Sequence, residues 1–169
     1  MVVKLIKLLL DRYYRLLKVV MTLLMALMLV PVSIQIVSRY TGIVPRYIWT
    51  EEVARFCFVW IIMIGSMVAV RDGTHFDVDL MPHPKTKREE GASKLVVHIA
   101  MTLMGLIFAW YGFQFAQFGA IQTSEMSGIN MLSIYISFPL AGVTWILFLA
   151  EKIVQDVRLI ASKKSETPT

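Results

Sequence analysis

Long apolar runs with almost no charged residues constrain the fold of this 169-residue chain more than any other feature. A helix needs roughly 20 residues to cross a bilayer core about 30 Å thick, and four runs of about that length occur. They cover residues 19–38, 53–70, 95–118 and 131–150. Arg55 and Arg71 lie at the ends of the second run, where their long side chains can reach the headgroups. The sequence therefore predicts an all-α integral membrane protein with four transmembrane helices in a single domain.

The distribution of Lys and Arg residues predicts the direction of insertion. Of the 17 cations, all but Arg39, Arg46 and Arg55 lie before the first span, between the second and third spans, or after the fourth. Because cytoplasmic loops carry an excess of Lys and Arg, we expect both termini to be cytoplasmic. The formal net charge of +5 belongs to these loops, so we expect no nucleic-acid partner.

The two ends of the chain and its last connection carry further signals. Residues 1–18 combine leucines with cations at helical spacing, which predicts an N-terminal amphipathic interfacial helix in contact with membrane lipids. Residues 160–169 are expected to fray. Between the third and fourth spans, Gly128 and Asn130 favour a turn, so these two spans should form a tight helical hairpin.

The spans are poor in the groups that drive transport. Pumps and secondary transporters usually carry ionisable residues inside the bilayer, because coupling needs groups that change protonation or coordination. We predict that the four cores hold no ionisable residue capable of this chemistry. Their polar side chains are suited to interhelical hydrogen bonds of about 0.6–2 kcal/mol each, or else to lining a substrate path, and they are Ser33, Gln35, Thr102, Gln114 and Gln117. The pattern favours an accessory subunit that is not an enzyme.

Three histidines raise the question of a haem or metal site. His75, His83 and His98 lie in or beside the connection between the second and third spans, so they cannot form the facing pairs that hold haem between transmembrane helices. His75 and His83 form a conceivable metal site together with Asp77 and Asp79. The alternation of polar and apolar residues there is more typical of an extended, half-buried loop. We therefore expect no metal ion or cofactor in this chain.

The connection between the first two spans carries the charges of the outer side. Thr50 is expected to cap a helix that begins at Glu51, and Glu51 to pair with Arg55 one turn later. Glu51 and Glu52 also suit the positive end of the helix dipole. One explanation of this segment is a well-formed helix start. The other is a docking surface for a protein outside the membrane, which would also include Arg39 and Arg46.

The order of these segments resembles a known family. Ser38-Arg39-Tyr40 is followed by residues 49–55, Trp-Thr-Glu-Glu-Val-Ala-Arg, then by Phe-Val-Trp and Ile-Gly-Ser, and finally by residues 70–79, Val-Arg-Asp-Gly-Thr-His-Phe-Asp-Val-Asp. Together with four spans and Pro139 in the last of them, this order resembles the small membrane subunit (DctQ-type) of tripartite ATP-independent periplasmic (TRAP) transporters. The resemblance covers about residues 19–151.

The resemblance implies a role and two protein partners. The system would be a sodium-driven importer of an organic acid, such as a C4-dicarboxylate, sialic acid or a related carboxylate, in the bacterial inner membrane. A large membrane subunit would bind sodium and move the substrate, and a periplasmic substrate-binding protein would deliver it. The small subunit would brace the large one and help dock the binding protein. The competing hypothesis is a self-contained four-span protein, such as a homodimeric small transporter or a membrane redox module.

Three groups of candidate residues follow. The periplasmic docking or interface candidates are Arg39, Arg46, Trp49, Glu51, Glu52 and Arg55. The cytoplasmic-side family motif comprises Arg71, His75, Asp77 and Asp79. Small residues let helix backbones approach closely, so packing against another helix or the large subunit is expected at Gly65, Ser66, Gly105 and Gly112, and also at Gln114.

Overall fold

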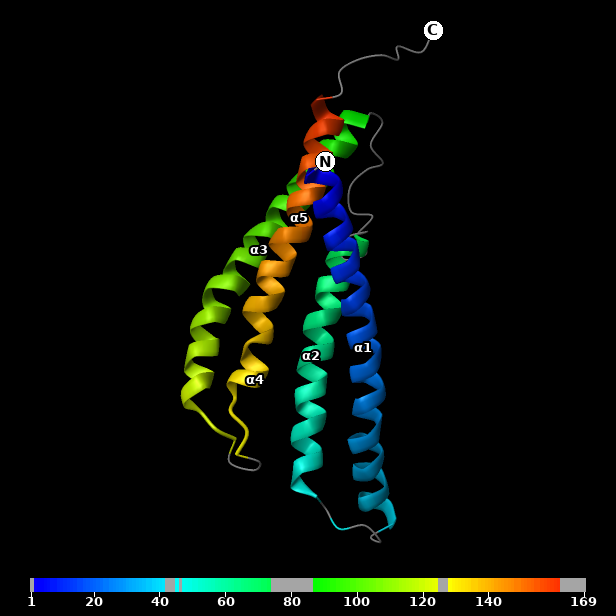
Figure 1. Cartoon of the computed structure of the whole chain (residues 1–169), viewed down its shortest axis with the longest axis vertical. Helices are drawn as coiled ribbons and strands as arrows, with labels where there is room; N and C mark the ends of the chain where they lie inside the picture. The colour runs from blue at the N-terminus through cyan, green and yellow to red at the C-terminus, as the bar shows by residue number, and fades with distance from the viewer. Residues whose placement is uncertain (1, 42–44, 46, 74–86, 125–127, 162–169) are drawn as a thin grey trace.

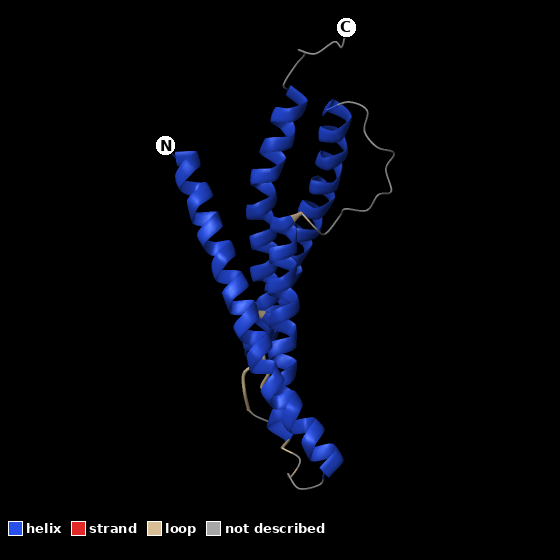
Figure 2. Cartoon of the chain, turned by 90° about the vertical axis from the view of Figure 1, so that its right-hand side faces the viewer, coloured by secondary structure: helices blue, strands red, loops and turns tan. Residues whose placement is uncertain are grey.

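The computed structural model describes residues 2–41, 45, 47–73, 87–124 and 128–161, which contain the helices α1 (Val2–Thr41), α2 (Ile48–Asp72), α3 (Lys87–Ile121), α4 (Leu132–Tyr135) and α5 (Ser137–Ala161). By length and composition, four stretches can cross a membrane, namely Lys7–Thr41, Ile48–Asp72, Lys94–Ile121 and Leu132–Val157. Figure 2 shows helices and no strand among the described residues. The predicted all-α fold with four spans is confirmed.

The long helices form two antiparallel pairs. α1 packs along α2 and α3 packs along α5, while α2 and α5 make the main contact between the pairs. In Figure 1 the pairs lie closest around the end of α2 and separate toward the α1–α2 connection and the α3–α4 turn, while Figure 2 shows the start of α1 standing apart from the end of α5. We call the end with the start of α1 and the end of α5 the terminal end. The loop end is the opposite one, with the α1–α2 connection and the α3–α4 turn.

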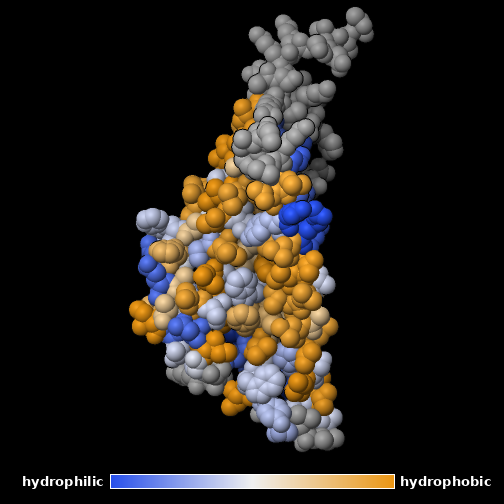
Figure 3. Space-filling model, viewed as in Figure 1, coloured by the Kyte–Doolittle hydropathy of each residue, from blue (hydrophilic) through white to orange (hydrophobic). Residues whose placement is uncertain are grey.

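The buried core lies where the two pairs converge. Met67 and Val70 of α2 and Phe148 and Leu149 of α5 are each 0% exposed, and Leu17 of α1 is 5% exposed. Many other large apolar side chains are exposed, which gives the broad apolar surface in Figure 3. Such a surface is expected when the solvent around a helix is lipid.

The predicted N-terminal amphipathic helix continues directly into the first span. Residues 2–18 and the first span form one continuous helix, because no glycine or proline interrupts the chain before Pro31. Tyr13 and Leu17 of this segment also pack on the core. With 40 residues, α1 is about 60 Å long, twice the thickness of a bilayer core.

The start of α2 also differs from the prediction. The helix begins at Ile48, and Thr50 lies in its first turn instead of capping a helix at Glu51. The Thr50 hydroxyl is turned back on the chain and donates to the Tyr47 carbonyl oxygen at 2.7 Å. At its other end, α2 stops at Gly73, whose φ of 78° favours glycine and whose N–H donates to the Ala69 carbonyl oxygen.

The predicted hairpin between the third and fourth spans is confirmed. An isolated β-bridge joins Thr123 to Asn130, and the Asn130 side chain both donates to the Ala120 carbonyl oxygen and accepts from the Leu132 N–H. Pro139 lies in the first turn of α5 and has no N–H to donate. This missing donor explains why the helix is interrupted at Ile136, between α4 and α5.

Small residues allow α3 and α5 to pack very closely. A Cβ added at Gly112 would lie 2.8 Å from the Pro139 nitrogen, and one added at Gly142 would lie 2.7 Å from the Gly105 carbonyl oxygen. Gly105 and Gly112 are thus covered by α5 of the same chain. In the structure, the helix that packs on these two glycines therefore belongs to the same chain.

We expect Gly112→Val to destabilise the α3–α5 pair, because the added atoms would meet backbone that cannot move aside. Overpacking of this kind costs about 1–3 kcal/mol, so the midpoint of thermal unfolding in detergent should fall. Gly65→Ala is the control, since its Cβ would make only an ordinary contact of 3.7 Å with Met21 Sδ. If Gly112→Val had the same midpoint of thermal unfolding as the parental chain, this close packing of α3 on α5 would be contradicted.

Candidate functional site

Arg71 at the end of α2 joins three helices. Its guanidinium donates to Glu151 of α5 and to Asp11 of α1, the latter at 2.5 Å. The Arg71 side chain is 14% exposed, and its guanidinium lies 5.2 Å from the centre of the Phe148 ring. Charge-assisted hydrogen bonds are the strongest hydrogen bonds in proteins, and burial against an aromatic ring strengthens them further. Arg71 therefore ties α1 and α5 to the end of α2.

Further charges surround Arg71 and complete a charged layer, which consists of Asp11, Lys18, Arg71, Asp72, Glu151 and Lys152. The Lys152 ammonium donates to the Val70 carbonyl oxygen at 2.8 Å, at the end of α2 where helix carbonyls lack intrahelical partners. Asp72 accepts from the Tyr14 hydroxyl and lies 3.8 Å from the Lys18 ammonium. The layer thus combines three cations with three carboxylates, and its charges are used within the chain.

A second polar contact, a hydrogen bond between His98 and Asp156, joins α3 to α5. His98 Nδ1 lies 2.5 Å from the Asp156 carboxylate, with the two side chains 15% and 6% exposed. His98 lies inside the predicted third span, so the expectation that the cores hold no ionisable group is wrong at this position. The pair lies toward the terminal end, as the charged layer does. Between these groups and the loop end, residues 19–38, 56–70, 99–121 and 132–150 contain no Asp, Glu, Lys, Arg or His.

The sequence pattern pointed to Arg71 but not to its partners. Asp11 is the only acid in the first 50 residues, which is a weak signal that could have marked it. The rest of the cytoplasmic-side motif, His75, Asp77 and Asp79, and with it the conceivable metal site that includes His83, lies outside the described residues. Among the described residues, no group of three or more His, Cys, Asp or Glu side chains could hold a metal ion.

At the loop end, the structure keeps part of the outer charged segment together. The predicted pair of Glu51 and Arg55 is confirmed at 3.8 Å, with both side chains more than 60% exposed. Trp49 is 49% exposed, and its ring centre lies 6.2 Å from that of Tyr47. Arg39 and Glu51 both line a pocket of about 420 Å³ between α1 and α2. Glu52 is half-buried, and Arg46 lies outside the described residues.

The remaining packing candidates have different neighbours. Gly65 faces Met21 of α1, and the Ser66 hydroxyl donates to the Met63 carbonyl oxygen of its own helix at 2.7 Å. Gly65 and Ser66 therefore both make their contacts within this chain, on α1 and α2 respectively. Gln114 differs, because it is exposed and lines an open pocket on α3.

We expect Arg71→Gln to destabilise the bundle, because it leaves the Asp11 and Glu151 carboxylates without their cation. For partly exposed partners we expect a loss of about 1–3 kcal/mol, measured by thermal unfolding in detergent. Arg55→Gln is the control, since an exposed pair contributes about 0–1 kcal/mol. If both variants unfolded at the same temperature, the charged layer would not be what joins the two pairs.

Comparison with known proteins places this architecture in a family. A family model for the DctQ component of tripartite ATP-independent periplasmic transporters matches residues 28–159. The sialic acid TRAP transporter small permease protein SiaQ of Vibrio cholerae is 27% identical over 143 residues, which cover 84% of this chain and 82% of that protein.

Two further relatives are much longer than this chain. The isethionate TRAP transporter permease protein DctMQ of Oleidesulfovibrio alaskensis is 24% identical over 131 residues, which cover 75% of this chain and 20% of that protein. The sialic acid TRAP transporter permease protein SiaT of Haemophilus influenzae is 25% identical over 109 residues, which cover 64% of this chain and 18% of that protein. Because the family model matches well over half of the sequence, this multi-pass membrane protein belongs to the DctQ component family of TRAP transporters.

Proposed function

We propose that this chain is the small permease subunit of a sodium-driven TRAP importer and that it braces the large membrane subunit. The observation that carries the proposal is where its charges lie. The ionisable groups of the described helices gather toward the two ends of the bundle, and those of the charged layer bind one another. The long uncharged middle offers no group for coupling to an ion. This arrangement suits a rigid support beside a transporting subunit.

The large subunit is the proposed main partner. DctMQ and SiaT are each named as a permease protein, and the match covers only about one fifth of their length. In those proteins, therefore, a unit like this chain is joined to a much longer polypeptide. We propose that the corresponding part is a separate subunit here, and that sodium is bound and substrate moved there. This chain itself would need no cofactor.

A periplasmic substrate-binding protein is the second proposed partner. If both termini lie on the cytoplasmic side of the bacterial inner membrane, as the Lys and Arg distribution predicts, the loop end faces the periplasm. There Trp49, Glu51 and Arg55 are exposed together at the start of α2, and Arg39 lies across the adjoining pocket. Exposed charges of this kind mainly steer association and fix its register. Arg46 and Glu52 complete the proposed docking set.

The substrate is proposed to be a small organic acid. The names of the relatives specify sialic acid and isethionate, which are both organic anions. A C4-dicarboxylate, sialic acid or a related carboxylate fits the same chemical class. We place substrate selection in the partner proteins, because the described helices of this chain lack buried charges aimed at a central path.

Co-purification and reconstitution distinguish an accessory subunit from a self-contained transporter. We expect tagged full-length chain to co-purify with the large permease subunit when the two are expressed together. The chain alone, in lipid vesicles with a sodium gradient, should accumulate neither succinate nor sialic acid. Accumulation of either by the chain alone, with no partner co-purifying, would favour the self-contained alternative.

We expect the double variant Glu51→Ala with Glu52→Ala to reduce substrate uptake by whole cells about 2- to 10-fold, because removal of interface charges slows association. Arg15→Ala is the matched control, since it removes an exposed charge from the terminal end. Membrane levels of each variant, measured by immunoblot, distinguish lost docking from lost insertion. If the double variant took up substrate as fast as the parent, Glu51 and Glu52 would have no role in docking.

A further inference from the structure

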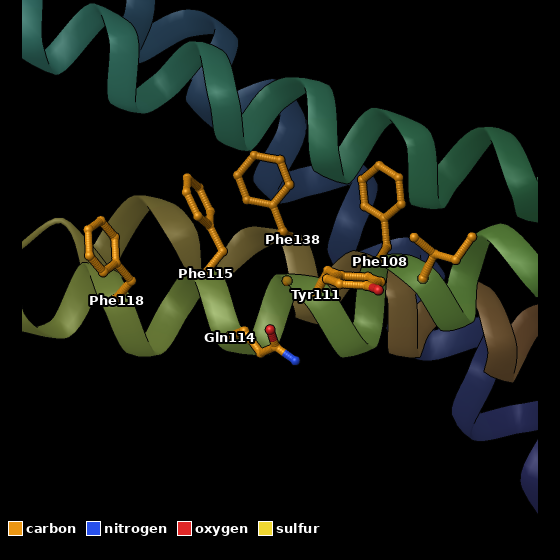
Figure 4. Close-up of a pocket in the computed structure, with 8 residues that line it drawn as sticks. Phe108, Tyr111, Gln114, Phe115, Phe118 and Phe138 are labelled. Atoms are coloured by element: carbon orange, nitrogen blue, oxygen red, sulfur yellow. The ribbon is translucent and has the colours of Figure 1, made fainter.

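An open aromatic pocket lies on the side of α3 toward the loop end. Its volume is about 540 Å³, and every lining residue belongs to α3 except Phe138 of α5. Figure 4 shows the rings of Phe108, Phe115, Phe118 and Phe138 along one side of the pocket. The side chain of Gln114 points to the opposite side. The pocket is therefore an aromatic surface with one amide at its edge.

The Gln114 amide is the unusual feature of this surface. It is exposed, it lies about 10 Å from the end of α3 along the helix axis, and none of the hydrogen bonds of the described residues involves it. Gln117 is exposed less than one turn away. Gln114 lies four residues inside the predicted span 95–118, and because lipid tails offer no hydrogen-bond partner, a long amide that faces them loses the bonds that it makes in water. A partner that brings its own polar group removes this penalty.

Two other faces of the bundle do not share this chemistry. The side of α3 with Gly105 and Gly112 is already covered by α5. The exposed side of α1 carries aliphatic side chains, namely Leu23, Leu27, Leu29 and Val30. Aliphatic chains suit lipid tails well, and Ser33 on the same helix is short enough for its hydroxyl to bond a carbonyl of its own backbone. The Gln114 face is thus the better protein interface.

We propose that a transmembrane helix of the large permease subunit packs on this face of α3, with its apolar side chains against Phe115 and Phe118 and a polar group hydrogen-bonded to Gln114. The inference rests on the proposed function, since it assigns the face by which this chain meets that subunit. The occupant is argued from the amide, which requires a polar partner within the membrane. It is also argued from DctMQ and SiaT, in which the matched unit is part of a much longer permease.

Photocrosslinking in the intact complex tests the interface. The probe is benzoylphenylalanine in place of Phe118, which is 56% exposed and already aromatic. The matched control carries it in place of Leu23 on α1, which is 63% exposed. Irradiation of the co-expressed complex in membranes should give a covalent adduct with the large subunit from position 118 and not from position 23. An adduct from position 23 alone, or from neither position in an intact complex, would overturn this interface.

The amide is tested separately by Gln114→Leu in the full complex, with Ser33→Leu as the matched control. The amount of large subunit retained after detergent washing should fall roughly 3- to 20-fold for Gln114→Leu, the range expected for one interhelical hydrogen bond. Retention should be unchanged for Ser33→Leu. Thermal unfolding of the isolated chain should be unchanged in both, because neither residue is buried. Full retention by Gln114→Leu, or a loss that follows lower stability of the isolated chain, would overturn this role.

The two proposals fail in different ways. If the parental chain never co-purifies with the large subunit, the proposed function is wrong and this interface is wrong with it. If the complex purifies intact and position 118 gives no adduct, only the assignment of the face is wrong.

Discussion

The two helix pairs are joined by a buried apolar core and by a layer of charges next to it. Along most of their length α2 and α5 diverge, and they meet closely only near the terminal end. There Arg71 contacts carboxylates of two other helices, and the Lys152 ammonium donates a hydrogen bond to the Val70 carbonyl oxygen at the end of α2. At the opposite end, the Trp60 indole donates to the Ser133 carbonyl oxygen at 3.0 Å. The bundle is therefore fastened strongly at one end and by a lighter contact at the other.

This fastening is compatible with the membrane because of where it lies. A cluster of six charges at the centre of a bilayer would be very costly, whereas near a helix end the side chains can reach the headgroups. The spans between the charged layer and the loop end can then remain free of charged residues. Such a chain can hold a fixed shape in lipid.

Local patterns in the sequence predicted the features that depend on nearby residues. The four spans, the turn around Gly128 and the pair of Glu51 with Arg55 each involve residues that are close along the chain. The partners of Arg71 lie 60 and 80 positions away, and Asp156 lies 58 positions from His98. Nothing local marks such pairs. The start of α2 was misplaced because Thr50 has the chemistry of a cap, while its hydroxyl is used to bond the preceding turn.

The length of α2 has a further consequence. Trp49 near its start and Arg71 near its end are about 33 Å apart along an ideal helix, close to the thickness of one hydrocarbon core, whereas α1 is far longer than the core. The exposed indole marks one interface and the charged layer around Arg71 lies toward the other, so α2 serves as a ruler for bilayer thickness. In a thinner membrane this helix has to tilt, and because α1 and α5 are bound to Arg71, the whole unit tilts with it.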